Sequence, residues 1–186
     1  MIHLQVAYII NANAPDLFWV ANFAPDYTND RALKDEIHLR NESDRMEALG
    51  QLKKKINMND PFEAGWLLHL FVDACWDATM IPAFKKKYEE TIEDWFMKYR
   101  EETALASFYL FHTLDWVPII WERILNADLS KISTVLPVAQ KDVEWFRTGV
   151  YKRHAQSDKR SISLEYTKKQ LIDFSEETAL KYRAWN

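Results

Sequence analysis

Glycine is scarce in this 186-residue chain, which has three glycines and six prolines. Average usage of about 7% predicts roughly 13 glycines at this length. Sandwiches, barrels and propellers need many tight turns, so a chain this poor in turn-forming residues argues against them. The three glycines, Gly50, Gly65 and Gly149, stand far apart. Rossmann and P-loop proteins need clustered glycines to cradle phosphate, so these classes are disfavoured too.

Cysteine is almost absent, since Cys75 stands alone. One cysteine excludes a disulfide framework and a cysteine-rich zinc site within one chain. The first residues show neither a basic region nor a long apolar stretch, so we expect no secretory signal. The longest apolar stretch, 64–75, contains His69 and Asp73 and is too short to cross a bilayer. We therefore expect a cytoplasmic protein with no transmembrane segment.

The charge balance is mildly acidic, with 24 basic and 28 acidic residues and a net charge of −4. A nucleic-acid-binding domain is usually strongly basic, so no such surface is evident. Hydrophobic residues make up 48% of the chain, enough for a sizeable core. Apolar positions recur at helical spacing nearly throughout. No repeat or linker divides residues 1–186, and we predict a single all-α domain, a bundle of about seven or eight helices.

The clearest helix start lies at residues 60–63. Asp60 can cap the helix, Pro61 suits its first position, and Glu63 falls three residues after the cap. The helix that follows is apolar on almost every face, which is typical of a buried central helix. We expect Pro82 to end it or to start the next helix. Other helices are expected at 2–10, from a cap at Ser43 or Asp44 to about 56, and at 83–99, 102–125, 138–153 and 164–184.

The apolar helix contains two polar side chains four residues apart, His69 and Asp73. This spacing places them on one helix face. A buried carboxylate needs a cation, a metal or strong hydrogen-bond donors. Imidazole nitrogen and carboxylate oxygen are both zinc ligands. A hydrogen bond between the two residues inside the core is the alternative.

Further ligand-type residues lie upstream, at His3, Asp26 and His38. His3 lies beside the apolar stripe of the first helix, Asp26 follows Ala24-Pro25 in a loop-like stretch, and His38 ends a polar segment. Each has a simpler interpretation: a frayed terminal residue for His3, a turn or cap residue for Asp26, and an exposed side chain for His38.

The order of these residues resembles the zinc-dependent phospholipase C family, whose superfamily includes fungal single-strand nucleases. The resemblance covers about residues 1–80. Its strongest parts are the Ala-Pro-Asp turn and the stretch GWLLHLFVDACW, which is similar to the Gly-x-x-x-His-x-x-x-Asp helix of that family. The resemblance implies that Asp26, His38, His69 and Asp73 form one zinc site. It implies that His3 and Asp73 hold a neighbouring ion, with Asp73 bridging and Asp26 able to take a proton from water.

This chain departs from the family pattern in two places. The secreted members bind metal through the amino group of a processed N-terminal tryptophan, whereas this sequence starts Met-Ile-His. They also hold a third zinc through ligands after the His-x-x-x-Asp helix, and here only His112 and His154 remain downstream. Other oxygen donors are Asp77, Glu101, Glu102 and Asp115, and we expect His112 to be a core residue. One or two zinc ions are expected, with Mn²⁺, Fe²⁺ or Ni²⁺ as alternatives.

The sequence therefore predicts a metal-dependent hydrolase, foremost a phosphoesterase acting on a small phosphate ester or a phospholipid-like substrate. Two alternatives stay open. A helical hydrolase of the HD type needs an adjacent His-Asp pair, and no His-Asp dipeptide occurs here. A metal-binding or interaction protein without activity would keep the buried His69–Asp73 pair but not the chemistry.

Overall fold

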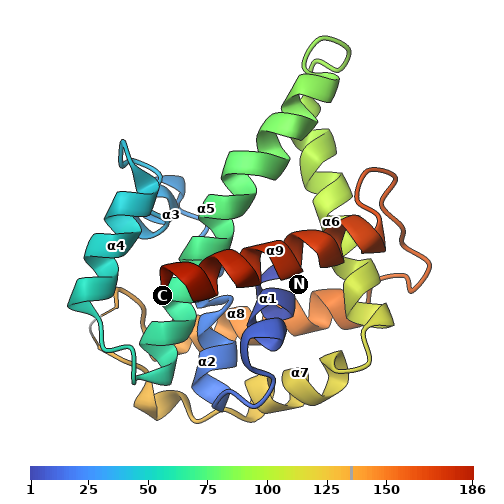
Figure 1. Cartoon of the computed structure of the whole chain (residues 1–186). Helices are drawn as coiled ribbons and strands as arrows, with labels where there is room; N and C mark the ends of the chain where they lie inside the picture. Colours follow the sequence, from blue (N-terminus) through green and yellow to red (C-terminus); the bar gives the residue numbers. More distant parts are fainter. Residues whose placement is uncertain (135) are drawn as a thin grey trace.

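The computed structural model describes residues 1–134 and 136–186, and these residues form helices and no strands (Figure 1). The predicted all-α class is confirmed. The α-helices are α1 (Ile2–Asn11), α2 (Asp16–Ala21), α3 (Arg31–Ile37), α4 (Arg45–Lys55), α5 (Pro61–Tyr88), α6 (Trp95–Thr113), α7 (Val117–Asn126), α8 (Gln140–Ala155) and α9 (Lys168–Trp185). Two 3-10 helices, η1 (Ala24–Tyr27) and η2 (Leu129–Lys131), lie between them. The described residues hold more helices than expected because α2 and α3 are only 6 and 7 residues long.

The starts of α4 and α5 follow the predicted caps. Asp44 accepts a hydrogen bond from the amide of Glu47, and Asp60 accepts from the amides of Phe62 and Glu63. These side chains satisfy amides that the first helical turn leaves free. Local capping chemistry therefore sets where both helices begin.

The expected break at Pro82 is wrong, because α5 continues through it to Tyr88. Pro82 deprives the Ala78 carbonyl of its usual donor, but both residues are exposed, so water can replace that donor. The turn lies at 89–94, after which α6 and α5 form a hairpin that projects from the body (Figure 1). The helix expected at 83–99 is wrong for this reason, and α6 begins at Trp95, before the expected start at 102.

The second boundary error lies near Pro118. The expected helix 102–125 is divided after Thr113, and α7 starts at Val117. Pro118 occupies the first turn of α7, where its missing N–H has no helical partner to lose. The proline thus starts a helix that the apolar pattern alone would join to α6.

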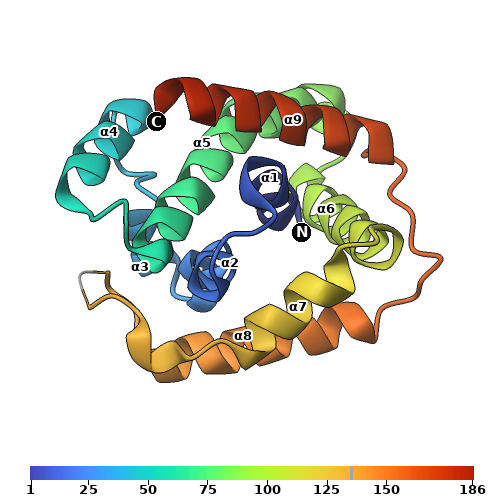
Figure 2. The same cartoon turned by 60° about the horizontal axis from the view of Figure 1, so that its bottom comes forward.

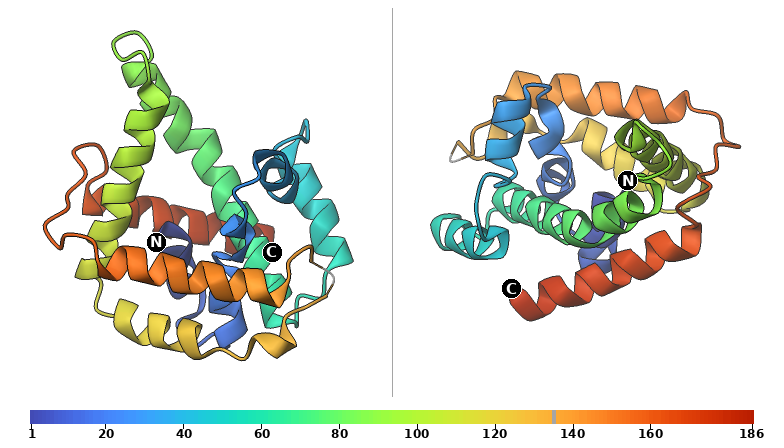
Figure 3. Two further views of the ribbon diagram at one scale, coloured as in Figure 1. Left: turned by 180° about the vertical axis from the view of Figure 1, so that it is seen from behind. Right: turned by 90° about the horizontal axis from the view of Figure 1, so that it is seen from above.

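The helices enclose α1, which Figure 2 shows near the middle of the molecule between α9, α5, α6 and α7. Figure 3 shows α8 on the side opposite α9, so that these two long helices cover opposite faces. The N-terminal half of α5 is buried, with every residue from Gly65 to Val72 inside the core. The expectation of a buried central helix holds for this half, whereas the half after Thr79 lies mostly in the projecting hairpin.

Helix α5 is also long and apolar enough to cross a membrane by length and composition. Its most apolar stretch of 18 residues has a mean hydropathy of 1.2, and 44% of that stretch is buried inside the structure. Core helices of globular proteins show the same properties. The expectation of no transmembrane segment therefore stays a prediction.

Gly65 allows α2 to lie directly against α5. A Cβ atom at this position would lie 2.4 Å from the carbonyl oxygen of Phe18 and 2.9 Å from the Cβ of Ala21. Neither atom belongs to a flexible side-chain end, so a larger residue would force the helices apart. Asn22, the residue after α2, is held next to the turn of α5 that carries His69.

We predict that Gly65→Ala lowers the free energy of unfolding by about 1–3 kcal/mol through overpacking. Gly149→Ala is the matched control, since Gly149 is an exposed residue of α8 with nothing within 4 Å of an added Cβ. This control should raise the free energy of unfolding by roughly 0.5–1 kcal/mol, because alanine favours a helix interior. Urea denaturation measures both, and equal stabilisation by the two substitutions would contradict the close contact.

Candidate metal centre

Five side chains that the sequence singles out meet where α1, η1, α3 and α5 converge. His3 lies in the first turn of α1, Asp26 in η1, and His38 directly after α3, while His69 and Asp73 lie one turn apart in α5. Their ligand-type atoms form two groups, in each of which all atoms lie within 4.8 Å of one another. One group is His3, His69 and Asp73, and the other is Asp26, His38 and His69. We call these five residues the His–Asp cluster.

The two buried histidines face each other through the same ring nitrogen. His38 Nδ1 lies 2.7 Å from the carbonyl oxygen of Lys34, and His69 Nδ1 lies 2.9 Å from the carbonyl oxygen of Asn22. A carbonyl oxygen only accepts, so both Nδ1 atoms carry the proton. The two Nε2 atoms lie 3.2 Å apart, and in the neutral tautomer with the proton on Nδ1 each presents a lone pair to the other.

Two lone pairs at this distance repel unless a proton or a cation lies between them. Both rings are fully buried, with 0% of each side chain exposed, so water cannot relieve the repulsion from outside. Metal-binding histidines typically donate the second ring N–H to a carbonyl or carboxylate, which fixes the tautomer and aims the other nitrogen. The backbone contacts of His38 and His69 are of this kind.

The distances among four of the residues fit the edges of a tetrahedral site. Zinc ligands at 2.0–2.2 Å from the ion lie about 3.3–3.6 Å from each other. His38 Nε2 lies 3.5 Å from Asp26 Oδ1 and 3.3 Å from Asp73 Oδ2. His69 Nε2 lies 4.0 Å from Asp26 Oδ2 and 3.7 Å from Asp73 Oδ2. Small side-chain shifts would bring the two carboxylates and the two imidazoles around one divalent ion.

Asp73 directs its two carboxylate oxygens to different partners. Oδ1 lies 2.9 Å from Nε2 of His3, while Oδ2 faces His38 and His69. The ring of His3 stacks on that of His69, with 4.0 Å between centroids and an interplanar angle of 8°. This is the arrangement that a carboxylate bridging two ions requires. The described contacts contain no His69–Asp73 hydrogen bond, because His69 Nε2 lies 3.7 Å from Asp73 Oδ2; Asp73 is hydrogen-bonded to His3 and Arg40 instead.

The protonation states suit a cation. Burial lowers the pKa of His69 to about 3, and the nearby His3 adds to this effect. Burial opposes ionisation of Asp73, but its hydrogen bond with His3 holds its pKa well below the usual value. The pKa of Asp26 is also held well below its usual value, against the effect of burial, by its contact with His38 and by the charge of Lys34. A neutral imidazole and ionised carboxylates are the forms that bind metal.

Two cations that the sequence analysis did not single out flank the cluster. Lys34 Nζ lies 2.6 Å from Asp26 Oδ1, and Arg40 Nη2 lies 3.3 Å from Asp73 Oδ2. Leu39, between His38 and Arg40, has a φ of 55°, an uncommon value for a residue other than glycine. The turn at Leu39 lets both neighbouring side chains reach the cluster. No sequence motif indicates these two cations, because only tertiary contacts bring them to the carboxylates of the cluster.

The downstream candidates lie in other surroundings. His112 is half-buried rather than in the core, its Nε2 lies 3.0 Å from the hydroxyl of Ser157, and it belongs to neither ligand group. Glu102 is buried and accepts from Ser163 and from the amide of Leu164. The remaining candidates belong to neither ligand group. Asp77 pairs with Arg40 and Arg45, and Glu101 and Asp115 are exposed.

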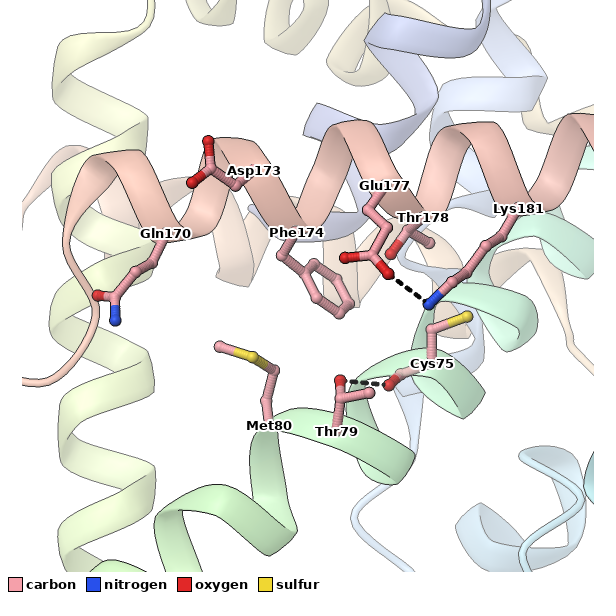
Figure 4. Close-up of a pocket in the computed structure, with 9 residues that line it drawn as sticks. All are labelled: Cys75, Thr79, Met80, Gln170, Asp173, Phe174, Glu177, Thr178 and Lys181. Atoms are coloured by element: carbon pink, nitrogen blue, oxygen red, sulfur yellow. Dashed lines mark hydrogen bonds and ion pairs between the residues drawn. The ribbon is translucent and has the colours of Figure 1, made fainter.

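A separate hollow of about 280 Å³ lies between α5 and α9 and contains Cys75. Figure 4 shows Glu177 paired with Lys181 on α9 and the hydroxyl of Thr79 bonded to the carbonyl of Cys75. Burial raises the pKa of the Cys75 thiol, which keeps it protonated and unreactive. This hollow contains no part of the His–Asp cluster.

Comparison with known proteins finds no relative of this chain. No protein-family model, curated protein or solved structure matches the chain. The resemblance of residues 1–80 to the zinc-dependent phospholipase C family therefore stays a prediction. The geometry of the His–Asp cluster itself supports a metal centre.

We predict that the protein without metal loses stability on acidification, in part through His69. Its pKa is about 3 in the folded state and near 6.5 when unfolded, so the unfolded chain binds more protons between these values. Stability must then fall as the pH drops below 6.5. His69→Asn keeps an N–H for the Asn22 carbonyl but removes the titration. The wild type should lose about 2 kcal/mol more than the variant between pH 7.5 and pH 5 in urea denaturation. Equal losses would contradict a neutral buried His69.

Proposed function

We propose that this protein is a metal-dependent phosphoesterase, with zinc as the first choice of metal. The observation that carries the proposal is the pair of Nε2 atoms of His38 and His69, which face each other 3.2 Å apart with both other ring nitrogens bound to carbonyls. A divalent cation bound by this pair would remove the repulsion between the two nitrogens, and two ionised carboxylates lie beside them as further ligands. The resemblance to the phospholipase C family points to the same residues.

The donor set divides between two ions. Asp26, His38, His69 and Asp73 would hold the first, because their ligand atoms lie at distances close to tetrahedral edges. His3 and the Oδ1 atom of Asp73 would hold a second. Mixed nitrogen and oxygen donors also accept Mn²⁺, Fe²⁺ or Ni²⁺.

Such ions supply Lewis acidity, which polarises a phosphoryl oxygen and lowers the pKa of water toward neutrality. The chain contributes a base: the ionised carboxylate of Asp26 has 31% of its side chain exposed and can accept a proton from the attacking water. Asp73, with 14% exposed, is confined by His3 and Arg40 and serves to hold the metal.

The charge of the site favours an anionic substrate. Lys34 and Arg40 balance the two carboxylates of the cluster, so a bound divalent ion makes the site net positive. Each of these cations has 33% of its side chain exposed. Lys34 can turn toward a phosphoryl oxygen, whereas Arg40 is also held by Asp35 and Asp77. We therefore favour a phosphate ester over a neutral ester or amide. A cytoplasmic location, which the single cysteine suits, is part of the same proposal.

His3 provides the sharpest test. We expect the wild type to contain about two equivalents of zinc and to hydrolyse bis(4-nitrophenyl) phosphate. His3→Ala should remove about one equivalent and reduce turnover by orders of magnitude, since a two-metal clamp contributes several kcal/mol to the transition state. Its fold should survive, because the first ion still neutralises Asp73.

The matched control is His112→Ala, which removes another half-buried histidine, one that is bonded to Ser157 outside the cluster. It should keep both the zinc content and the turnover. Elemental analysis and a colorimetric assay on the same samples measure the two quantities. Zinc without turnover in the wild type would leave a metal-binding protein and overturn the phosphoesterase proposal, and equal values in wild type and His3→Ala would remove His3 from the site.

A further inference from the structure

The connection between α8 and α9, which lies outside the helical body in Figure 1, directs two apolar side chains into solvent. Leu164 is 83% exposed, the largest value among the exposed large hydrophobic side chains of the described residues, and Ile162 is 62% exposed. Between them, Ser163 is only 5% exposed. Folded domains bury aliphatic side chains more often than serine, so this segment reverses the usual order.

Hydrogen bonds hold the connection in this reversed order. The buried carboxylate of Glu102 on α6 accepts from the hydroxyl of Ser163 at 2.6 Å and from the amide of Leu164 at 2.9 Å. The hydroxyl of Ser163 in turn accepts from the amide of Tyr166, a buried residue, at 2.9 Å. Because these bonds fix the backbone on both sides of Leu164, the exposure of the two apolar side chains is part of the fold.

Basic side chains surround the two apolar ones. Residues 152–169 contain six basic and two acidic residues, a net charge of +4, whereas the whole chain has a net charge of −4. All six basic residues are exposed: Lys152, Arg153, Lys159, Arg160, Lys168 and Lys169. Their ion pairs, Asp158 with Arg160 and Asp173 with Lys169, lie at the surface and are therefore weak. We call residues 152–169 the basic–apolar segment.

We propose that the basic–apolar segment docks the protein onto an anionic membrane surface. Its cations bind the anionic lipid headgroups, and Ile162 and Leu164 enter the boundary between headgroups and acyl chains. Durable attachment at a bilayer surface takes an apolar and a polybasic contribution together, and the segment provides both. No residue of the segment belongs to the His–Asp cluster, so this inference does not rest on the proposed function.

The small apolar area favours a bilayer over a protein partner. Stable protein interfaces bury about 800 Å² on each side around a well-packed apolar centre, and two aliphatic side chains supply only a small part of that area. A nucleic acid would use the cations, but its phosphate backbone offers no apolar medium for the aliphatic side chains. A bilayer satisfies both groups without requiring a complementary shape.

Sedimentation with sucrose-loaded vesicles tests the proposal. We expect the protein to bind vesicles of phosphatidylcholine containing about 30% phosphatidylserine, and to bind phosphatidylcholine alone at least about tenfold more weakly, because only the first surface is anionic. Raising the salt from about 0.1 M to about 0.5 M should weaken binding to the anionic vesicles, since salt screens the attraction.

Leu164→Ser tests the apolar contribution. It should weaken binding to the anionic vesicles at least about tenfold, because one fewer leucine side chain leaves water. Leu180→Ser is the matched control, since Leu180 is also exposed, at 64%, but lies on α9 outside the segment. The control should change binding less than twofold. Both side chains lie at the surface, so both variants should keep the fold.

A pair of charge variants tests the ionic contribution. Lys159→Gln combined with Arg160→Gln should weaken binding to the anionic vesicles about tenfold, because each cation near such a surface adds to the attraction. Lys54→Gln combined with Lys55→Gln removes the same charge from two exposed residues of α4. Figures 1 and 2 show α4 on the side of the molecule opposite the α8–α9 connection, so this control should change binding less than twofold.

Binding to the anionic vesicles that Leu164→Ser weakens and Leu180→Ser does not supports the proposal. It is overturned if the wild type binds neither vesicle, if it binds both equally, if Leu164→Ser binds like the wild type, or if the α4 charge variant loses as much affinity as the variant in the segment. Binding to poly-L-glutamate or transfer RNA as tight as to the vesicles, and unchanged by Leu164→Ser, would assign the surface to an acidic protein or a nucleic acid and also overturn it.

These outcomes do not depend on metal content or turnover. A protein that docks on anionic vesicles as described but never hydrolyses a phosphate ester would refute the proposed function and leave the docking surface standing. An active phosphoesterase that binds no vesicle would do the reverse.

Discussion

The close contact between α2 and α5 at Gly65 positions the part of α5 that carries His69 and Asp73. Because this residue has no Cβ, the carbonyl of Phe18 and the side chain of Ala21 lie against the backbone of α5. That approach places the carbonyl of Asn22 within 2.9 Å of His69 Nδ1, one turn further along. The ring is thereby locked with Nε2 toward the cluster. The Gly, His and Asp at four-residue intervals on α5 thus have linked positions: Gly65 allows the helix contact, His69 is oriented by it, and Asp73 is the carboxylate that would bridge the two proposed ions.

Electrostatics connects this packing to chemistry. A carboxylate among apolar helices is stable only beside positive charge, and the chain supplies Lys34 and Arg40 at the rim of the cluster. These cations leave the inner space between His38 and His69 unfilled by any described donor, since both rings direct lone pairs there. A divalent ion in that space would satisfy the rings and the carboxylates together. The same addition would turn the site net positive toward an anionic substrate.

The sequence predicted the parts of this arrangement that depend on local patterns. Helical spacing placed His69 and Asp73 on one face, and the capping residues Asp44 and Asp60 marked two helix starts. Pro82 misled the helix boundaries because the cost of a proline depends on whether water reaches the carbonyl it leaves free, which is a tertiary property. Gly65 was visible only as a motif residue, and its close contact with α2 required the structure.

Long-range partners were beyond any local pattern. The carbonyl of Asn22 and the cation of Arg40 reach the cluster across 47 and 33 residues of sequence. Such contacts follow no spacing rule, so the sequence indicates the ligand-type residues but not the groups that orient them.

The most direct test of the central claim is X-ray absorption at the zinc edge of the protein loaded with one equivalent of zinc. The account predicts two imidazole nitrogens and carboxylate oxygens at about 2.0–2.2 Å, with no sulfur scatterer. His38→Ala should reduce the imidazole count by one or abolish binding. A zinc ion surrounded by water, a sulfur ligand, or failure to retain zinc at all would contradict the claim that the facing lone pairs of His38 and His69 form a metal site.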